Sequence, residues 1–163
     1  QWRSSAASDV YKRQALDHGS KAYQLNPNDP RVSSVYGEIL IRTDNISEGI
    51  NHLEKAYELD PIPQGQSTSD RRIYALLTGY YFSNNIEKCK DLINKVVELD
   101  FKSWLLSYDI YTKNNIEIND NWFTKGLEKF KNVDIKLEID RFHLNNSVLQ
   151  SELENTAKKI FIA

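Results

Sequence analysis

The amino-acid sequence predicts an all-α protein made of stacked antiparallel helix pairs. Two observations support this fold class. Apolar residues recur with helical spacing from Ala15 onward, and the chain aligns with itself when it is shifted by 34 residues. Repeats of about 20–50 residues are typical of solenoids, in which each unit buries its apolar faces only against its neighbours.

The self-alignment joins two segments that each end in a proline. Five residues are identical at this offset: Lys21, Ala22, Tyr23, Leu25 and Pro27 in the first segment, and Lys55, Ala56, Tyr57, Leu59 and Pro61 in the second. Because proline cannot continue a helix, we expect each segment to be the end of the second helix of a pair.

Residues 30–61 form the clearest copy, and this copy resembles a tetratricopeptide repeat (TPR). Tyr36-Gly37 occupies the Leu-Gly position of the first helix, and Gly49 and Ala56 occupy small-residue positions of the second. Small residues allow two helices to approach closely. The resemblance implies a TPR-like superhelix of helix pairs, closed by a C-terminal capping segment.

The repeat register divides the chain into segments. We expect a half repeat at 15–29, repeats at 30–61, 70–101 and 102–131, a surface loop inserted at 62–69, and a capping segment at 132–163.

The capping segment has an ambiguous pattern. Residues 133–139 alternate as a half-buried strand would, but they also fit one helical stripe, and helix is the favoured interpretation. Ser147 and Gln150 have the spacing of a capping box, so a new helix is expected to begin near Ser147.

The first residues look different from the rest. Residues 1–14 show no helical apolar period, the chain contains no methionine, and Ser4–Gln14 is similar to a translated sequencing adapter. We therefore expect residues 1–14 to be a non-native or disordered leader, the chain to be a fragment, and an upstream domain to be missing.

Composition excludes several function classes. The net charge of −2 argues against a nucleic-acid partner, and the apolar runs are too short to span a membrane. Cys89 is the single cysteine, so no internal disulfide can form, and its small-residue packing position predicts a buried, unreactive thiol. The cytoplasm is the expected compartment.

No catalytic, metal or cofactor site is predicted. The six glycines are never clustered, which excludes a glycine-rich phosphate loop. His18 and His52 recur at one repeat position, but two nitrogen ligands are too few for zinc. Both histidines are expected to face solvent.

The resemblance implies that residues of the first helix of each pair line a concave groove for a partner. Carried over to this chain, the partner-binding residues are Arg31, Ser34, Glu38, Arg42, Arg71, Tyr74, Tyr81, Trp104, Tyr108 and Tyr111. Arginines would attract an acidic peptide, and aromatic rings would anchor it. The alternative for Trp104 is that the C-terminal segment covers it.

Two functions remain open from the sequence. One is a scaffold that binds a partner protein or peptide. The other is a regulatory TPR arm of a larger enzyme or transcription regulator, because Asp120–Phe130 is similar to the element that closes the repeat arms of some bacterial nucleotide cyclases and transcription regulators.

Overall fold

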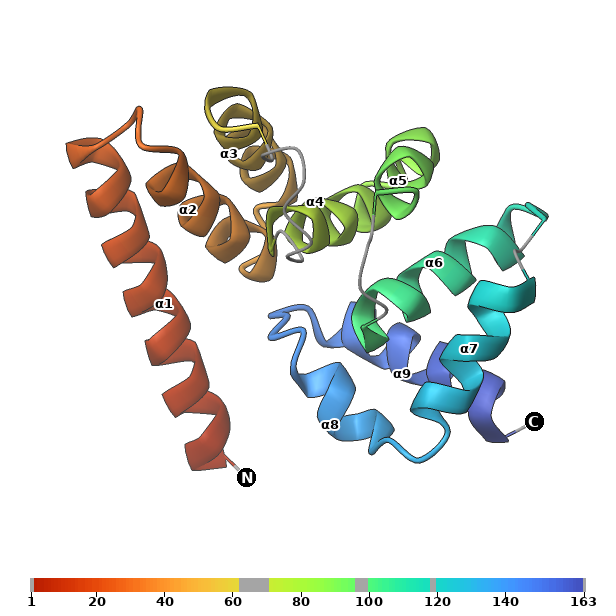
Figure 1. Cartoon of the computed structure of the whole chain (residues 1–163). Helices are drawn as coiled ribbons and strands as arrows, with labels where there is room; N and C mark the ends of the chain where they lie inside the picture. Colours follow the sequence, from red (N-terminus) through yellow and green to blue (C-terminus); the bar gives the residue numbers. More distant parts are fainter. Residues whose placement is uncertain (1, 62–70, 96–99, 118–119, 163) are drawn as a thin grey trace. The chain divides into compact units, whose positions relative to one another are not determined.

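The computed structural model describes residues 2–61, 71–95, 100–117 and 120–162, and every regular element within them is an α-helix (Figure 1). The chain divides into two compact units, Gln1–Gln66 and Ser67–Ala163, each described here by itself. The first unit contains α1 (Trp2–Leu25), α2 (Pro30–Arg42) and α3 (Ile46–Leu59). The second contains α4 (Arg71–Phe82), α5 (Ile86–Ile93), α6 (Phe101–Lys113), α7 (Asp120–Phe130), α8 (Ile135–Asp140) and α9 (Ser147–Ile162). The all-α prediction is confirmed for these residues, and the TPR-like superhelix stays a prediction.

Helices α2 and α3 form a close hairpin because glycines face each other across it. A Cβ atom added at Gly37 would lie 2.7 Å from the carbonyl oxygen of Gly49, and the reverse distance is also 2.7 Å. Leu53 and Ala56 on α3 are fully buried. The predicted close contacts at these small positions are confirmed.

The same turn ends the first helix of three hairpins. Asp44, Asn84 and Asn115 all have a positive φ, which Asp and Asn tolerate better than most residues. In each turn the next residue donates its N–H to the carbonyl five residues back: Asn45 to Leu40, Asn85 to Tyr80 and Ile116 to Tyr111, each at 2.9 Å. This Schellman-type ending supports the internal repeat independently of the sequence identities.

The expected helix pairs of the second unit are present. Helices α4 and α5 lie in the repeat predicted at 70–101. Helices α6 and α7 correspond to the repeat predicted at 102–131, except that α6 begins one residue earlier, at Phe101. Two predicted features lie outside the described residues. They are the loop at 62–69 and the part of the expected second helix that carries Val96 and Leu99.

The structure places most of the expected leader in a helix. Residues 2–14, expected to be a non-native or disordered leader, form the first half of α1, and that expectation stays a prediction. They lack glycine and proline, so a helix that begins at Ala15 can extend backwards without an apolar stripe. Val10 and Tyr11 are exposed, so this extension buries little apolar surface there.

The C-terminal segment is helical. Helix α8 covers Ile135 onward, so the helical interpretation of this stretch is confirmed, and α9 begins at Ser147 as predicted. The capping box is wrong. Asn146 caps α9 instead, because its Oδ1 accepts from the N–H groups of Val148 at 3.1 Å and Leu149 at 3.3 Å. Asn is as good an N-cap as Ser, and Gln150 donates to Asp140 instead.

Helix α6 forms the core of the second unit. It contacts α4, α5, α7, α8 and α9. Trp104, Leu105, Leu106 and Ile110 on this helix are almost completely buried. A helix that is apolar on most sides requires neighbours on most sides, which explains why α8 and α9 pack against it.

Candidate functional site

The predicted groove residues of the first unit all lie on α2. Glu38 and Arg42 form an ion pair one helical turn apart. Ser34 is half-buried. Arg31 is the most accessible of the four, with a side chain that is 87% exposed, and it pairs with Asp29 at 3.2 Å.

Arg31 borders an open cleft between α1 and α2, which we call the α1–α2 cleft. The cleft has a volume of about 410 Å³. It is lined by Gly19, Ala22, Asp29, Arg31, Val32, Val35 and Tyr36. Its walls are thus mostly apolar, with one ion pair beside them.

Local structure fixes the charged end of this cleft. Asp29 is the N-cap of α2, and its carboxylate accepts the N–H of Arg31 at 2.8 Å. The side-chain and backbone hydrogen bonds from Arg31 hold the pKa of Asp29 below its usual value. The pair therefore stays ionised at neutral pH.

Sequence reasoning found Arg31 but missed the apolar wall of the cleft. Val35 is 56% exposed, and Val32 is half-buried. The sequence did contain one indication of this wall: Val32 and Val35 are apolar, yet they fall between the positions of α2 that pack on α3. A single exposed valine is common on protein surfaces, so the sequence alone could not mark Val35 as part of a cleft. The structure does so because α1 lies beside this part of α2.

The second unit corrects the prediction for Trp104. Its side chain is 0% exposed and cannot line an open groove. The indole packs against Tyr108, Phe123, Phe130 and Phe161, with ring centroids 5.4–6.0 Å away. Phe161 belongs to α9, so the alternative in which the C-terminal segment covers Trp104 is partly right, and α7 supplies the rest of the cover.

Of the other predicted aromatic residues, Tyr108 stacks on the buried Trp104 rather than on an open groove. Tyr108 is half-buried and stacks on Phe123 at 4.6 Å. Tyr111 and Tyr74 are half-buried on α6 and α4. The side chain of Arg71 lies outside the described residues.

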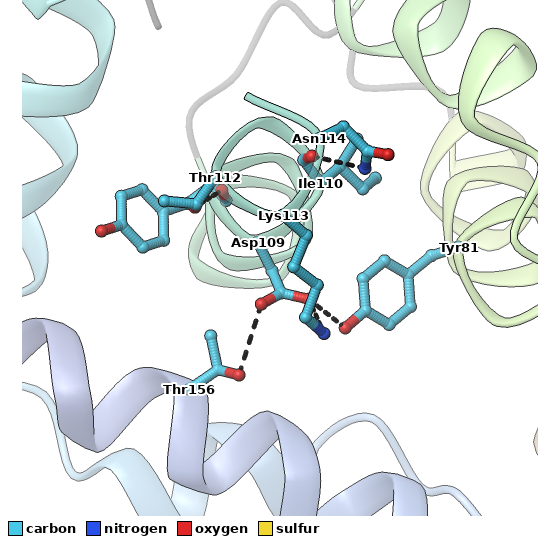
Figure 2. A network of polar contacts seen from close by, with 8 residues as sticks. Tyr81, Asp109, Ile110, Thr112, Lys113, Asn114 and Thr156 are labelled. Carbon is cyan, nitrogen blue, oxygen red and sulfur yellow. Dashed lines mark hydrogen bonds and ion pairs between the residues drawn. The ribbon is translucent and has the colours of Figure 1, made fainter. Parts of the chain in front are cut away.

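Tyr81 points to a buried carboxylate that the sequence analysis missed. Its hydroxyl donates to Oδ2 of Asp109 at 2.6 Å, and Thr156 donates to Oδ1 at 3.4 Å (Figure 2). Lys113 lies 2.6 Å from the same Oδ2. Burial and the bond to Asp109 raise the pKa of Tyr81 well above its usual range. Only the four-residue spacing of Asp109 and Lys113 could have indicated part of this network.

This network joins α4, α6 and α9 rather than forming a reactive site. Three donors occupy the Asp109 carboxylate, which is 5% exposed as a residue. A buried charge that is paired and hydrogen-bonded is a stable structural arrangement. Tyr81 itself is half-buried, and its hydroxyl is held by Asp109.

His52 is another correction. It was expected to face solvent, but its side chain is only 13% exposed. Its ring contacts Tyr23 and Tyr36 edge-on, with centroids 4.4 and 4.8 Å away. Burial lowers the pKa of His52, Glu48 opposes that effect, and Lys55 adds to it. Helix α1 covers this position, which the repeat pattern alone did not reveal.

Cys89 is fully buried, as predicted, and burial raises its pKa to about 12, so the thiol is protonated at neutral pH. The described residues contain no group of three or more His, Cys, Asp or Glu side chains that could hold a metal ion. In the same part of the chain, no helix has the length and apolar character needed to cross a bilayer.

Comparisons of the chain with protein-family models, with curated proteins and with solved structures find no match. Among the described residues, the α1–α2 cleft is the strongest candidate site.

Proposed function

We propose that the chain is a protein-interaction module that binds a partner peptide or domain at the α1–α2 cleft. The observation that carries this proposal is the exposed apolar wall of the cleft, where Val35 is 56% exposed beside Gly19 and Ala22. A concave, mostly apolar lining with a few polar groups is typical of binding sites, and this cleft of about 410 Å³ has such a lining.

Arg31 favours an acidic partner. Its side chain is 87% exposed, so the guanidinium can contact a second carboxylate while it keeps its bond to Asp29. A charge at the edge of an apolar site changes the rate of encounter more than the lifetime of the complex. The apolar wall would supply most of the binding energy.

The polar residues of the described chain support binding rather than catalysis. The buried carboxylate of Asp109 is engaged by Tyr81, Thr156 and Lys113. The thiol of Cys89 is buried and protonated. Neither group is available to a substrate.

The test is a selection of random peptides, both linear and helix-constrained, on the full chain. Selected peptides should bind the Val35→Glu variant at least tenfold more weakly. Val10→Glu is the matched control, because Val10 is also 56% exposed but lies about two and a half turns before Gly19, on the opposite side of α1. If no peptide is selected, or if both variants bind equally, the proposal is wrong.

A second candidate function is a regulatory arm of a larger enzyme or transcription regulator. It is favoured by the resemblance of residues 120–130 to the closing element of such arms, a segment that coincides with α7. Sequencing of the flanking gene would test this candidate: an adjoining cyclase or DNA-binding domain would support it, and an unrelated flanking domain would contradict it.

A further inference from the structure

Each helix of the first unit contributes one aromatic ring to a cluster beside the α1–α2 cleft. Tyr23 of α1, Tyr36 of α2 and His52 of α3 form this three-ring cluster. The two tyrosine rings stack with centroids 5.6 Å apart, and both contact the imidazole edge-on. Tyr36 also lines the cleft and packs on α1, because a Cβ atom added at Gly19 would lie 2.9 Å from its Cδ2. The imidazole is therefore one ring away from the cleft.

The surroundings of His52 suit the neutral form of its ring. Its Nδ1 is buried without a hydrogen-bond partner. Its Nε2 lies 3.9 Å from Oε1 of Glu48, which is beyond hydrogen-bond distance. A protonated imidazole carries an N–H on both nitrogens, so its Nδ1–H would be a buried donor without an acceptor. Such a donor destabilises the arrangement that buries it.

The charged groups around His52 do not offset this cost. Glu48 favours the charged ring, but Lys55 opposes it, and both belong to α3. Lys55 is also held in place, because its Nζ donates to the Tyr23 hydroxyl at 3.1 Å. From α1 and α2, the groups that face the ring are the phenols of Tyr23 and Tyr36. Burial is the largest effect, and it lowers the pKa of His52.

Helix α1 is the helix of the first unit that can separate most easily. None of the residues 10–25 of this helix is fully buried. In contrast, Leu53 and Ala56 of α3 are fully buried, and α2 and α3 approach each other closely at Gly37 and Gly49. Elements with little buried apolar surface open at a lower free energy than the rest of a protein. Disturbance of the three-ring cluster should therefore release α1 before it separates α2 from α3.

We propose that His52 is a pH switch for the docking of α1, and that its protonation in mildly acidic solution releases α1 from the α2–α3 hairpin. Release removes Tyr23 from the imidazole and lets water reach it, so the released form binds the extra proton more strongly. As the pH falls below 6.5, uptake of one proton should weaken docking by up to about tenfold per pH unit. Release also removes one wall of the α1–α2 cleft, so a partner bound there would dissociate; this consequence rests on the proposed function.

Hydrogen exchange of the full chain, followed by mass spectrometry, tests the switch. Rates are corrected for the intrinsic effect of pH. From pH 7 to about pH 5.5, we expect the protection of residues 15–25 to fall at least threefold, while that of residues 46–59 changes less. His52→Phe should abolish this difference, because phenylalanine has a similar ring and takes up no proton. His18→Phe is the matched control, because His18 is the equivalent residue of the repeat and is exposed on α1.

Two exchange results overturn the switch: unchanged protection of residues 15–25 in the original chain, or an equal loss in His52→Phe. A titration of the histidine ring protons by NMR needs no change at His52, so it decides even if His52→Phe does not fold. We expect the ring of His52 to titrate below pH 6.5. If it titrates at or above that pH, the tyrosine rings stabilise the cation, and the switch is overturned.

The peptides selected on the full chain separate the switch from the proposed function. Between pH 7 and about pH 5.5, their affinity should fall at least threefold for the original chain and for His18→Phe, but not for His52→Phe. If the protection of α1 falls while the peptide affinity is unchanged, the peptides bind elsewhere. The proposed function is then wrong, and the switch stands. If the protection does not fall, the switch is wrong, whatever the peptides do.

Discussion

The substitution Gly126→Ala gives the sharpest test of the second unit's core. Gly126 is a buried residue of α7, and a Cβ atom added there would overlap the indole of Trp104 at Nε1. That nitrogen is buried without a hydrogen-bond partner, which is consistent with a ring placed by packing alone. The added methyl group therefore has to displace the indole or separate α7 from α6.

The effect of Gly→Ala on the free energy of unfolding is expected to have opposite signs at a packed and at an exposed glycine. In an exposed helix interior, Gly→Ala stabilises by about 1 kcal/mol through helix propensity. Overpacking of a filled core costs about 1–3 kcal/mol. The overlap here is severe, and Tyr108 and Phe123 stack on the indole and restrict its rotation. We expect the cost to lie at the upper end of that range, for a net loss of about 2 kcal/mol.

The assay is urea denaturation of the full chain followed by circular dichroism. Lys125→Ala is the matched control, because Lys125 is exposed one residue before Gly126 and the substitution changes helix propensity little. Trp104→Phe should reduce the cost of Gly126→Ala by about 1 kcal/mol or more, because the smaller ring leaves room for the methyl group. Two results would refute this packing. One is a stabilising effect of Gly126→Ala, and the other is a double variant whose loss of stability equals the sum of the two single losses.

Fluorescence offers an independent measure of the same core. With Trp2 and Trp122 replaced by Phe, emission reports Trp104 alone. Because Trp104 is 0% exposed, acrylamide should quench it weakly in the folded chain and strongly in urea. Efficient quenching without urea would restore the open-groove interpretation.

The remaining predictions concern polar groups and the first hairpin. Tyr81→Phe removes a donor from the buried Asp109, so the free energy of unfolding should fall by about 1–3 kcal/mol, while Tyr111→Phe should have little effect in the same urea titration. Ala56→Leu should overpack the α2–α3 contact and cost about 1–3 kcal/mol; an unchanged midpoint would contradict that placement. Burial lowers the pKa of His52 from 6.5, so the folded chain binds fewer protons than the unfolded one as the pH falls below 6.5. Stability should therefore decrease there, and a pH series of melting temperatures should show that His52→Phe weakens this decrease.

Much of the fold could be predicted because its local signals agree with one another. Helix ends are marked by residues that act on the backbone directly, such as Pro61 and the positive-φ residues Asp44 and Asn84. The close contact of Gly37 and Gly49 follows from the repeat register. These signals depend on neighbours in sequence, so they can be read without knowledge of the tertiary structure.

The candidate site was predicted less well because it depends on which helix covers which face. The expected repeat register placed Trp104 at an open position, but α7 and α9 cover it. His52 lies on the second helix of its pair, yet α1 buries it through Tyr23. In both cases the covering residues are far away in sequence, and no periodicity indicates them.

The same dependence on neighbouring helices explains why equivalent positions of the repeat differ in burial. Equivalent positions of a repeat tend to bury equivalent faces, because each unit needs the contact of its neighbours for stability. Leu53 and Ala56 follow this rule and are fully buried, whereas Gly19 and Ala22 do not. The small residue at Gly19 instead lets α2 approach α1 closely, because a Cβ atom added there would lie 2.9 Å from Cδ2 of Tyr36 and 3.1 Å from Cδ1 of Ile39. Val35 lines the same cleft but remains 56% exposed, because the contact between α1 and α2 is made by Tyr36 and Ile39 rather than by Val35.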